Sequence, residues 1–265
     1  MTLAAMITHN ARIDNATGTG RSRMRRTLLL VITALALVVD SASGFVVQHT
    51  PVQRRSSAIF SSFDSESWKA IEADLDALPV FTVSTESGEP LAYTVETHGK
   101  SFQVPFFYCN VQDALAELQK AKEVTGVEQI ALLPFPLGQA YKMWSNDEAV
   151  MVPSRVAMVQ ADAPPDTDPY GQQVPFFACL SIMLPTDNGK GVLPLFMALE
   201  DANTAMTEVL ETKGGNPEEF EILPMSLGEA VDILMAANPG DQSSFQFIAP
   251  STSKKYIDEF LSKDQ

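Results

Sequence analysis

The chain has 265 residues, 45% of them apolar, and 33 acidic against 18 basic side chains give it a formal charge of −15 at pH 7. This composition excludes a disordered, collagen-like or fibrous chain, and the length suits one large domain or two small ones. Residues 1–60 hold seven basic and two acidic side chains, so the rest of the chain carries a net charge of −20. An acidic body lacks the clustered Lys and Arg that phosphate contacts require, so we expect no nucleic-acid partner.

Residues 1–44 have the features of a secretory signal peptide. Four arginines between positions 21 and 26 precede the apolar run from Leu28 to Val39, and small residues follow at positions 41–44. The run is too short to cross a bilayer, so a cleaved signal that ends at Gly44 is favoured over an anchor or a buried helix. Met24 is an alternative initiator that would leave a shorter signal.

Residues 45–63 have the composition of an organelle transit peptide. They contain no acidic residue, two arginines and four serines, a bias that such targeting segments share. A signal peptide followed by a transit-peptide-like segment, with Phe45 at the junction, resembles the bipartite leader of algae whose plastid arose by secondary endosymbiosis. We expect the mature chain to begin near residue 60.

The first part of the body reads as a helix followed by a mixed set of strands and helices. Helical spacing of Trp68, Ile71 and Leu75 predicts a helix over residues 65–77. Strands are predicted at residues 78–83, 91–95, 104–109 and 130–133. Asn110 is a suitable N-cap for a helix that follows the third strand, and another helix is predicted from Leu137.

The same order of motifs then recurs, which indicates a duplication. Leu133-Pro134-x-x-Leu137-Gly138-x-Ala140 returns as Leu223-Pro224-x-x-Leu227-Gly228-x-Ala230, 90 residues later. Pro79 and Phe81 match Pro175 and Phe177 at 96 residues, Pro105 and Phe107 match Pro194 and Phe196 at 89, and Asp113-Ala114 matches Asp201-Ala202 at 88. The second copy has helices predicted at residues 199–210 and 251–261, and a capping box at Ser226 and Glu229 that begins a further helix.

We therefore predict an α+β fold of two pseudo-symmetric repeats, each a small β-sheet covered by helices. The first helix and repeat one occupy residues 64–160, a proline-containing linker occupies 161–173, and repeat two with the C-terminal helix occupies 174–265.

The body contains few residues from which an active site could be assembled. His98 is its single histidine and lies in a predicted turn. Cys109 and Cys179 are the chain's two cysteines, without a Cys-x-x-Cys or Cys/His pattern, and are interpreted as buried apolar residues in preference to a disulfide or reactive thiol. Three aspartates, Asp162, Asp166 and Asp168, are interrupted by prolines and match no calcium loop. We predict no catalytic, cofactor-binding or metal-binding residue, and no enzymatic activity.

A binding module is the remaining class of function. Fifteen Phe and eleven Met can supply adaptable apolar surface, although most of them are expected in the core. The candidate peptide-binding positions are Phe81, Phe107, Phe177 and Phe196, for which a core position is the stronger interpretation. The net charge of the body would also attract basic, acid-poor segments such as transit peptides, and less so at high salt.

The body resembles the Tic-twenty-two family, a soluble component of the chloroplast protein-import machinery. The resemblance covers about residues 65–262 and rests on the order of Leu78-Pro79-Val80-Phe81, Val104-Pro105-Phe106-Phe107, Leu137-Gly138-Gln139-Ala140-Tyr141, Val174-Pro175-Phe176-Phe177 and Leu193-Pro194-Leu195-Phe196. It implies a two-winged fold of related halves with apolar pockets on the flanks of the sheets. It also implies a chaperone-like, peripheral protein between envelope membranes, with preproteins and translocon subunits as partners.

The first hypothesis is thus a non-enzymatic import chaperone in the intermembrane or periplastidial space of a complex plastid. One alternative is a thiol-based redox protein that uses Cys109 and Cys179. Another is a structural envelope adaptor that binds folded partners.

Overall fold

The computed structural model describes residues 63–97, 100–185, 191–214, 216, 220–237 and 244–261, all of which belong to one structural unit. The predicted signal peptide, the transit-peptide-like segment up to residue 62 and the turn at His98 lie outside these residues. Phe63, the last residue of that predicted segment, is buried and packs edge-on against Trp68 with ring centroids 4.7 Å apart.

Repeat one is a five-stranded sheet with strand order β2-β3-β1-β4, and its short fifth strand pairs with β3. Helix α3 precedes it. The elements are α3 (Glu66–Asp76), β1 (Pro79–Ser84), β2 (Ala92–Thr97), β3 (Lys100–Tyr108), α4 (Val111–Thr125), β4 (Ala131–Pro136), α5 (Leu137–Ser145), β5 (Val150–Val152) and α6 (Arg155–Gln160).

Repeat two has the same strand order, since its first strand again lies between its third and fourth strands. The elements are β6 (Pro175–Cys179), β7 (Leu184–Pro185), β8 (Gly191–Phe196), α7 (Leu199–Lys213), β9 (Ile222–Ser226), α8 (Leu227–Ala236), β10 (Phe245–Ile248), α9 (Ser251–Tyr256) and the π-helical turn η2 (Ile257–Leu261). Two antiparallel-based sheets flanked by helices confirm the predicted α+β fold of two repeats.

Each repeat ends with a parallel strand and a short helix, and of these the sequence motifs predict only the C-terminal helix of repeat two. Strand β5 runs parallel to β3, and β10 runs parallel to β8. The equivalence extends to single hydrogen bonds, because the Cys109 amide donates to the Val152 carbonyl (3.0 Å) and the Met197 amide donates to the Ile248 carbonyl (3.1 Å). A strand of three residues is too short to show a periodic pattern, which explains why sequence reasoning missed it.

Strand register corrects one of the predicted matches between the repeats. Phe81 lies opposite Tyr108, and Phe177 lies opposite Phe196, so Tyr108 and not Phe107 is the counterpart of Phe196. The spacing is therefore 88 residues, the same as for Asp113 and Asp201, and the match at 89 is wrong. Because adjacent strand residues face opposite sides of a sheet, this single residue changes the face to which Phe107 is assigned.

The helices begin where capping residues satisfy their free amides. The Ser65 hydroxyl accepts from the Trp68 amide (3.1 Å), and the Asn110 side chain accepts from the amides of Gln112 and Asp113 (2.7 and 3.3 Å). The capping box predicted at Ser226 is present: its hydroxyl accepts from the Glu229 amide, and the Glu229 carboxylate accepts from the Ser226 amide.

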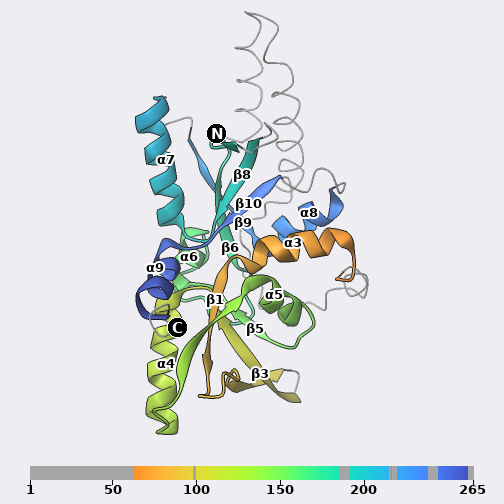
Figure 1. Cartoon of the computed structure of the whole chain (residues 1–265), viewed down its shortest axis with the longest axis vertical. Helices are drawn as coiled ribbons and strands as arrows, with labels where there is room; N and C mark the ends of the chain where they lie inside the picture. The colour runs from red at the N-terminus through yellow and green to blue at the C-terminus, as the bar shows by residue number, and fades with distance from the viewer. Residues whose placement is uncertain are drawn as a thin grey trace, which may run out of the picture. The chain divides into compact units, whose positions relative to one another are not determined.

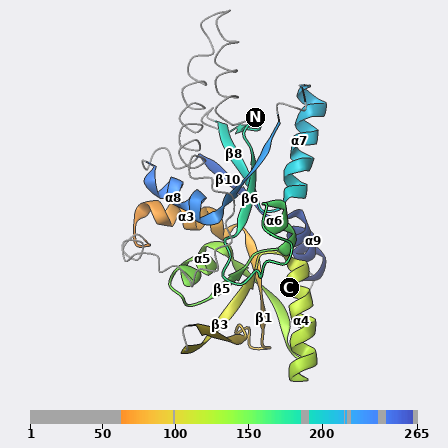
Figure 2. The same ribbon diagram turned by 180° about the vertical axis from the view of Figure 1, so that it is seen from behind.

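The helices form two groups on opposite sides of the sheets. Helices α4, α6, α7 and α9 lie on one side, and α3, α5 and α8 lie on the other (Figure 1 and, from behind, Figure 2). Helix α3 contacts α5 of repeat one and also α8 and β10 of repeat two. Its buried face, with Trp68, Ile71 and Leu75, therefore joins the two repeats.

The repeats also exchange their last helices. Ala157 of α6 and the adjoining Ala161 pack with Phe177 and Phe196 of repeat two. In return, Tyr256 and Ile257 at the end of α9 pack on the cluster of repeat one that contains Phe81. Each repeat therefore completes the apolar core of the other.

The predicted linker at residues 161–173 contains no helix or strand but is packed against the body. Ala161 and Ala163 are buried, and the Tyr170 ring lies 5.2 Å from that of Phe106. The segment therefore links the repeats while it packs against the body.

Candidate functional site

The four candidate phenylalanines are core residues in this conformation. Phe81, Phe107, Phe177 and Phe196 are 0%, 0%, 1% and 7% exposed. Phe81, Phe177 and Phe196 lie among residues packed by α4 and α7, whereas Phe107 stacks on Phe135 with ring centroids 4.6 Å apart. None of the four offers surface to a peptide, so accessible apolar surface must be sought elsewhere.

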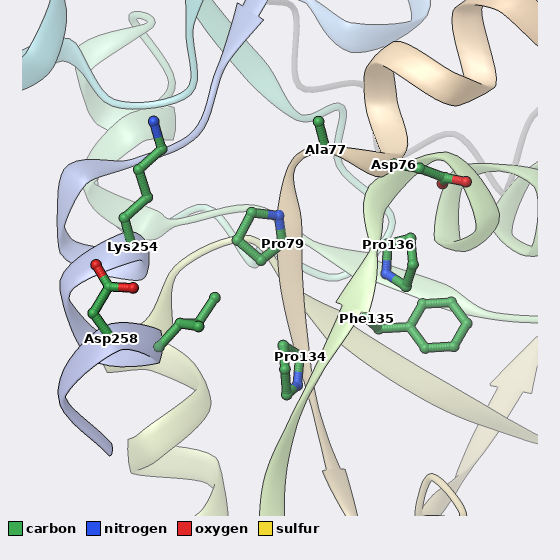
Figure 3. A pocket seen from close by; sticks show the side chains of 9 residues that line it. Asp76, Ala77, Pro79, Pro134, Phe135, Pro136, Lys254 and Asp258 are labelled. Carbon is green, nitrogen blue, oxygen red and sulfur yellow. The ribbon is translucent and has the colours of Figure 1, made fainter. Parts of the chain in front are cut away.

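An open pocket of about 400 Å³ lies between the edge of the first sheet and the C-terminal helix. One wall comes from the end of α3 and from strands β1 and β4, and the other comes from α9 and η2. Figure 3 shows Lys254 and Asp258 on the helical wall, facing the prolines of β1 and β4. The lining residues are Asp76, Ala77, Pro79, Pro134, Phe135, Pro136, Lys254, Ile257 and Asp258.

The prolines of this pocket also determine the chemistry of the sheet edge. Strand β4 is the last strand of its sheet, and the Leu137 amide donates inward to the Leu78 carbonyl (3.0 Å). Since alternate amides of a strand point in opposite directions, the nitrogens of Pro134 and Pro136 lie on the free edge. Proline has no N–H, so this edge cannot bind a further strand by regular pairing.

Repeat two closes its corresponding edge by related means. The Leu227 amide donates to the Val174 carbonyl (2.8 Å), which places Pro224 on the free edge of β9. The next outward amide, that of Ser226, donates to the Glu229 carboxylate (2.8 Å). The repeated Leu-Pro motif thus marks two protected sheet edges.

The pocket combines an apolar floor with charged side chains at its rim. The Phe135 ring turns away to stack on Phe107, which leaves proline rings, Ala77 and Ile257 as the apolar lining. Asp76 accepts a hydrogen bond from the Gln139 amide at the start of α5 (3.2 Å). Such a surface suits an apolar side chain with a neighbouring cation.

Both cysteines are buried and free. Cys109 is 4% exposed and Cys179 is 0% exposed. Burial raises the pKa of both thiols, and the nearby Asp113 carboxylate raises the pKa of Cys109 further. A buried thiol held in its protonated form is a poor nucleophile, so the geometry does not favour the redox alternative.

A polar cluster that sequence reasoning missed lies under the β2–β3 hairpin. Tyr108 is buried and Tyr93 is half-buried near Glu117 of α4, and burial, followed by the Glu117 charge, raises the pKa of both phenols. Both therefore remain neutral. The members of this polar cluster are far apart in the sequence, so no local motif predicts the cluster.

Other predicted features can be placed only in part. His98 lies outside the described residues. Asp162, Asp166 and Asp168 are exposed on the linker. Within the described part of the chain, no three His, Cys, Asp or Glu side chains gather as a metal site would require, and no helix is both long and apolar enough to span a bilayer.

Comparison with known proteins decides the family. The model of the Tic22-like family matches residues 20–258. The chain belongs to the Tic22-like family. This confirms the resemblance that the sequence motifs indicate, and this family is associated with plastids and protein import. No curated protein sequence matches the chain.

Two solved Tic22 structures share the fold. Tic22 from Plasmodium falciparum is 19% identical with a TM-score of 0.59, and the match covers 74% of this chain and 98% of that one. Anabaena Tic22, described as a protein-transport protein, is also 19% identical, with a TM-score of 0.55 and coverage of 73% and 97%. The α+β fold of two helix-flanked sheets is therefore one that this chain shares with solved Tic22 structures.

Proposed function

We propose that this Tic22-like chain acts as a non-enzymatic, chaperone-like component of protein import into a plastid. It binds basic preprotein segments between envelope membranes, as a peripheral protein. Family membership supports the role in import, and the leader-like composition of residues 1–63 supports delivery to a complex plastid.

The pocket beside α9 is the structural feature that supports a binding role. Its proline floor provides rigid apolar surface, which costs little conformational entropy to cover because proline rings are already fixed. The acidic body, with a net charge of −20 beyond residue 60, favours approach of a cationic segment through long-range attraction. Together these properties select a segment that is both apolar and basic.

Binding is tested by titrating the chain with a fluorescent transit peptide rich in Arg and Ser. We expect saturable binding that weakens by about tenfold between 50 and 300 mM salt, because screening shortens the range of the attraction. A matched peptide in which Gln replaces each Arg should bind weakly at both salt concentrations. Absence of binding at low salt would contradict the chaperone role and leave the adaptor, which would co-purify with folded partners without affinity for peptides.

A further inference from the structure

The two exchanged helices, α6 and α9, occupy equivalent places, but some equivalent residues are less buried at α9 than at α6. Strands β5 and β10 align at a spacing of 96 residues, which continues through α6 and α9 and makes Ala157 equivalent to Ser253. In and directly after α6, Ala157, Met158 and Ala161 are buried. Their counterparts are Ser253, which is buried, Lys254, which is exposed, and Ile257, which is half-buried.

Ser253 weakens the contact that α9 makes. Its side chain is 0% exposed, and its hydroxyl has no hydrogen-bond partner. A buried hydroxyl without a partner loses its hydration and gains no protein contact in return, so it disfavours the docked state. Repeat one has Ala157 at the same place, where no such penalty arises.

The hydrogen bonds that hold α6 and α9 in place also differ. Helix α6 is held at its end by hydrogen bonds from the Ala163 amide to the Met158 carbonyl (2.9 Å) and from Gln160 to Glu200 (2.8 Å). Helix α9 is held at its start, where the Ser251 amide donates to the Asp201 carboxylate (2.8 Å). Beyond it, η2 contains no buried residue, and Phe260 is 59% exposed.

We propose that α9 and η2 form a displaceable cover on repeat one, and that the surface beneath accepts a short basic amphipathic helix in their place. The opening of the cover is independent of the proposed function, whereas the choice of occupant rests on it. Helix α6 remains closed over the corresponding surface of repeat two.

The chain's own segment defines the chemistry of the occupant. It presents an adjacent aromatic and aliphatic pair, Tyr256 and Ile257, to the cluster of repeat one, and the Tyr256 ring packs edge-on against Phe81 at 6.0 Å. Lys254 and Lys255 precede the pair and Asp258 and Glu259 follow it, so the preference for a basic occupant comes from the acidic body and not from the segment itself. A preprotein helix with the same apolar pair preceded by cations would reproduce these contacts. Once the cover opens, Phe81 joins the proline pocket, whereas Phe177 and Phe196 stay beneath α6.

Hydrogen exchange on the full chain tests the cover. Ser253→Ala should raise the protection of amides 251–261 about fivefold, because it removes the unsatisfied hydroxyl. Tyr256→Ala should lower that protection at least about tenfold while the amides of β1 keep theirs, because only the docking contact is lost. Thr252→Ser, a change at an exposed position of the same helix, should alter neither the protection of amides 251–261 nor that of the β1 amides. Equal protection of α9 and β1 in all three variants would overturn the proposal.

Binding of a synthetic peptide with the sequence of residues 250–261 tests the surface beneath. Tyr256→Ala should bind this probe at least about fivefold more tightly than the unmodified chain, and Ser253→Ala should bind it more weakly, since the cover and the probe compete. If the cover opens but the affinities do not change, the surface beneath is not the binding site. Failure of the proposed function would appear separately, as absent binding of the transit peptide to the unmodified chain.

Discussion

At the scale of single residues, two helices approach each other closely at Gly138. A Cβ at this position would lie 2.6 Å from the Asp76 carboxylate and 2.8 Å from the Glu72 carbonyl. The Leu-Gly-x-Ala motif therefore exists because helix α5 passes directly against the end of α3. The motif recurs at Gly228, which is also buried.

Gly138→Ala should lower the free energy of unfolding by about 1–3 kcal/mol, because the Glu72 carbonyl belongs to the backbone and cannot move aside. Chemical denaturation measures the change. Gln139→Ala is the matched control, since that side chain is exposed in the same turn and should cost little. A Gly138→Ala chain as stable as the unmodified one would contradict the close approach.

At the scale of elements, the repeats provide an internal comparison of helix caps. Asn110 caps α4 with two hydrogen bonds, whereas its counterpart Ala198 gives α7 no side-chain cap. The two positions have nearly the same backbone angles, with φ of −123° and −129° and ψ of 132°. An asparagine, as at position 110, therefore suits the backbone at position 198.

Ala198→Asn should raise the free energy of unfolding by about 1 kcal/mol, and Asn110→Ala should lower it by a similar amount. Thermal unfolding of both single variants and of the double variant measures whether the two changes in the free energy of unfolding are opposite and similar in size. The double variant should return close to the stability of the unmodified chain, because the two caps lie on different helices. A destabilised Ala198→Asn variant would show that the helix starts are not equivalent.

The elements with strong local signals could be predicted from the sequence, and those set by distant contacts could not. The helix with Trp68, Ile71 and Leu75, the Asn110 cap and the Ser226–Glu229 capping box depend on neighbours within one turn. Strands β5 and β10 are defined by partners 44 and 52 residues away. The sequence pattern assigns Phe107 the wrong register because a Pro-x-Phe pattern occurs on both strands one residue out of phase.

The candidate site was less predictable than the fold. The phenylalanines that mark the repeats do so because they fill the cores, and strong motifs of this kind signal burial more often than binding. The pocket instead joins Pro79, Pro134 and Ile257, which lie on three elements distant in the sequence. The prolines of the Leu-Pro motif were the available sequence signal for this pocket. They indicate a free sheet edge only once the strand order is known.

At the scale of the whole unit, the exchange of α6 and α9 couples the stability of the two repeats. Each core is incomplete without a helix from the other, and α3 contacts both. We therefore expect one cooperative unfolding transition for the two sheets, apart from local opening of the C-terminal helix.

Val83→Ala in repeat one should lower the free energy of unfolding by about 1–3 kcal/mol through the cavity it leaves. The loss of amide protection should be equal in β1 and β6, as hydrogen exchange can measure. Cys179→Ala, at the equivalent position of repeat two, should likewise affect both sheets by equal amounts. Loss confined to the mutated repeat would show that the sheets unfold separately.

The proline rings on the free edges of β4 and β9 also bear on self-assembly. A protein that meets extended polypeptides runs the risk of recruiting them into growing fibrils, because an open edge is a template for strand addition. Rings without an N–H remove that template at both edges. If the chain binds unfolded cargo as proposed, we expect the β4 and β9 edges not to recruit that cargo by strand addition.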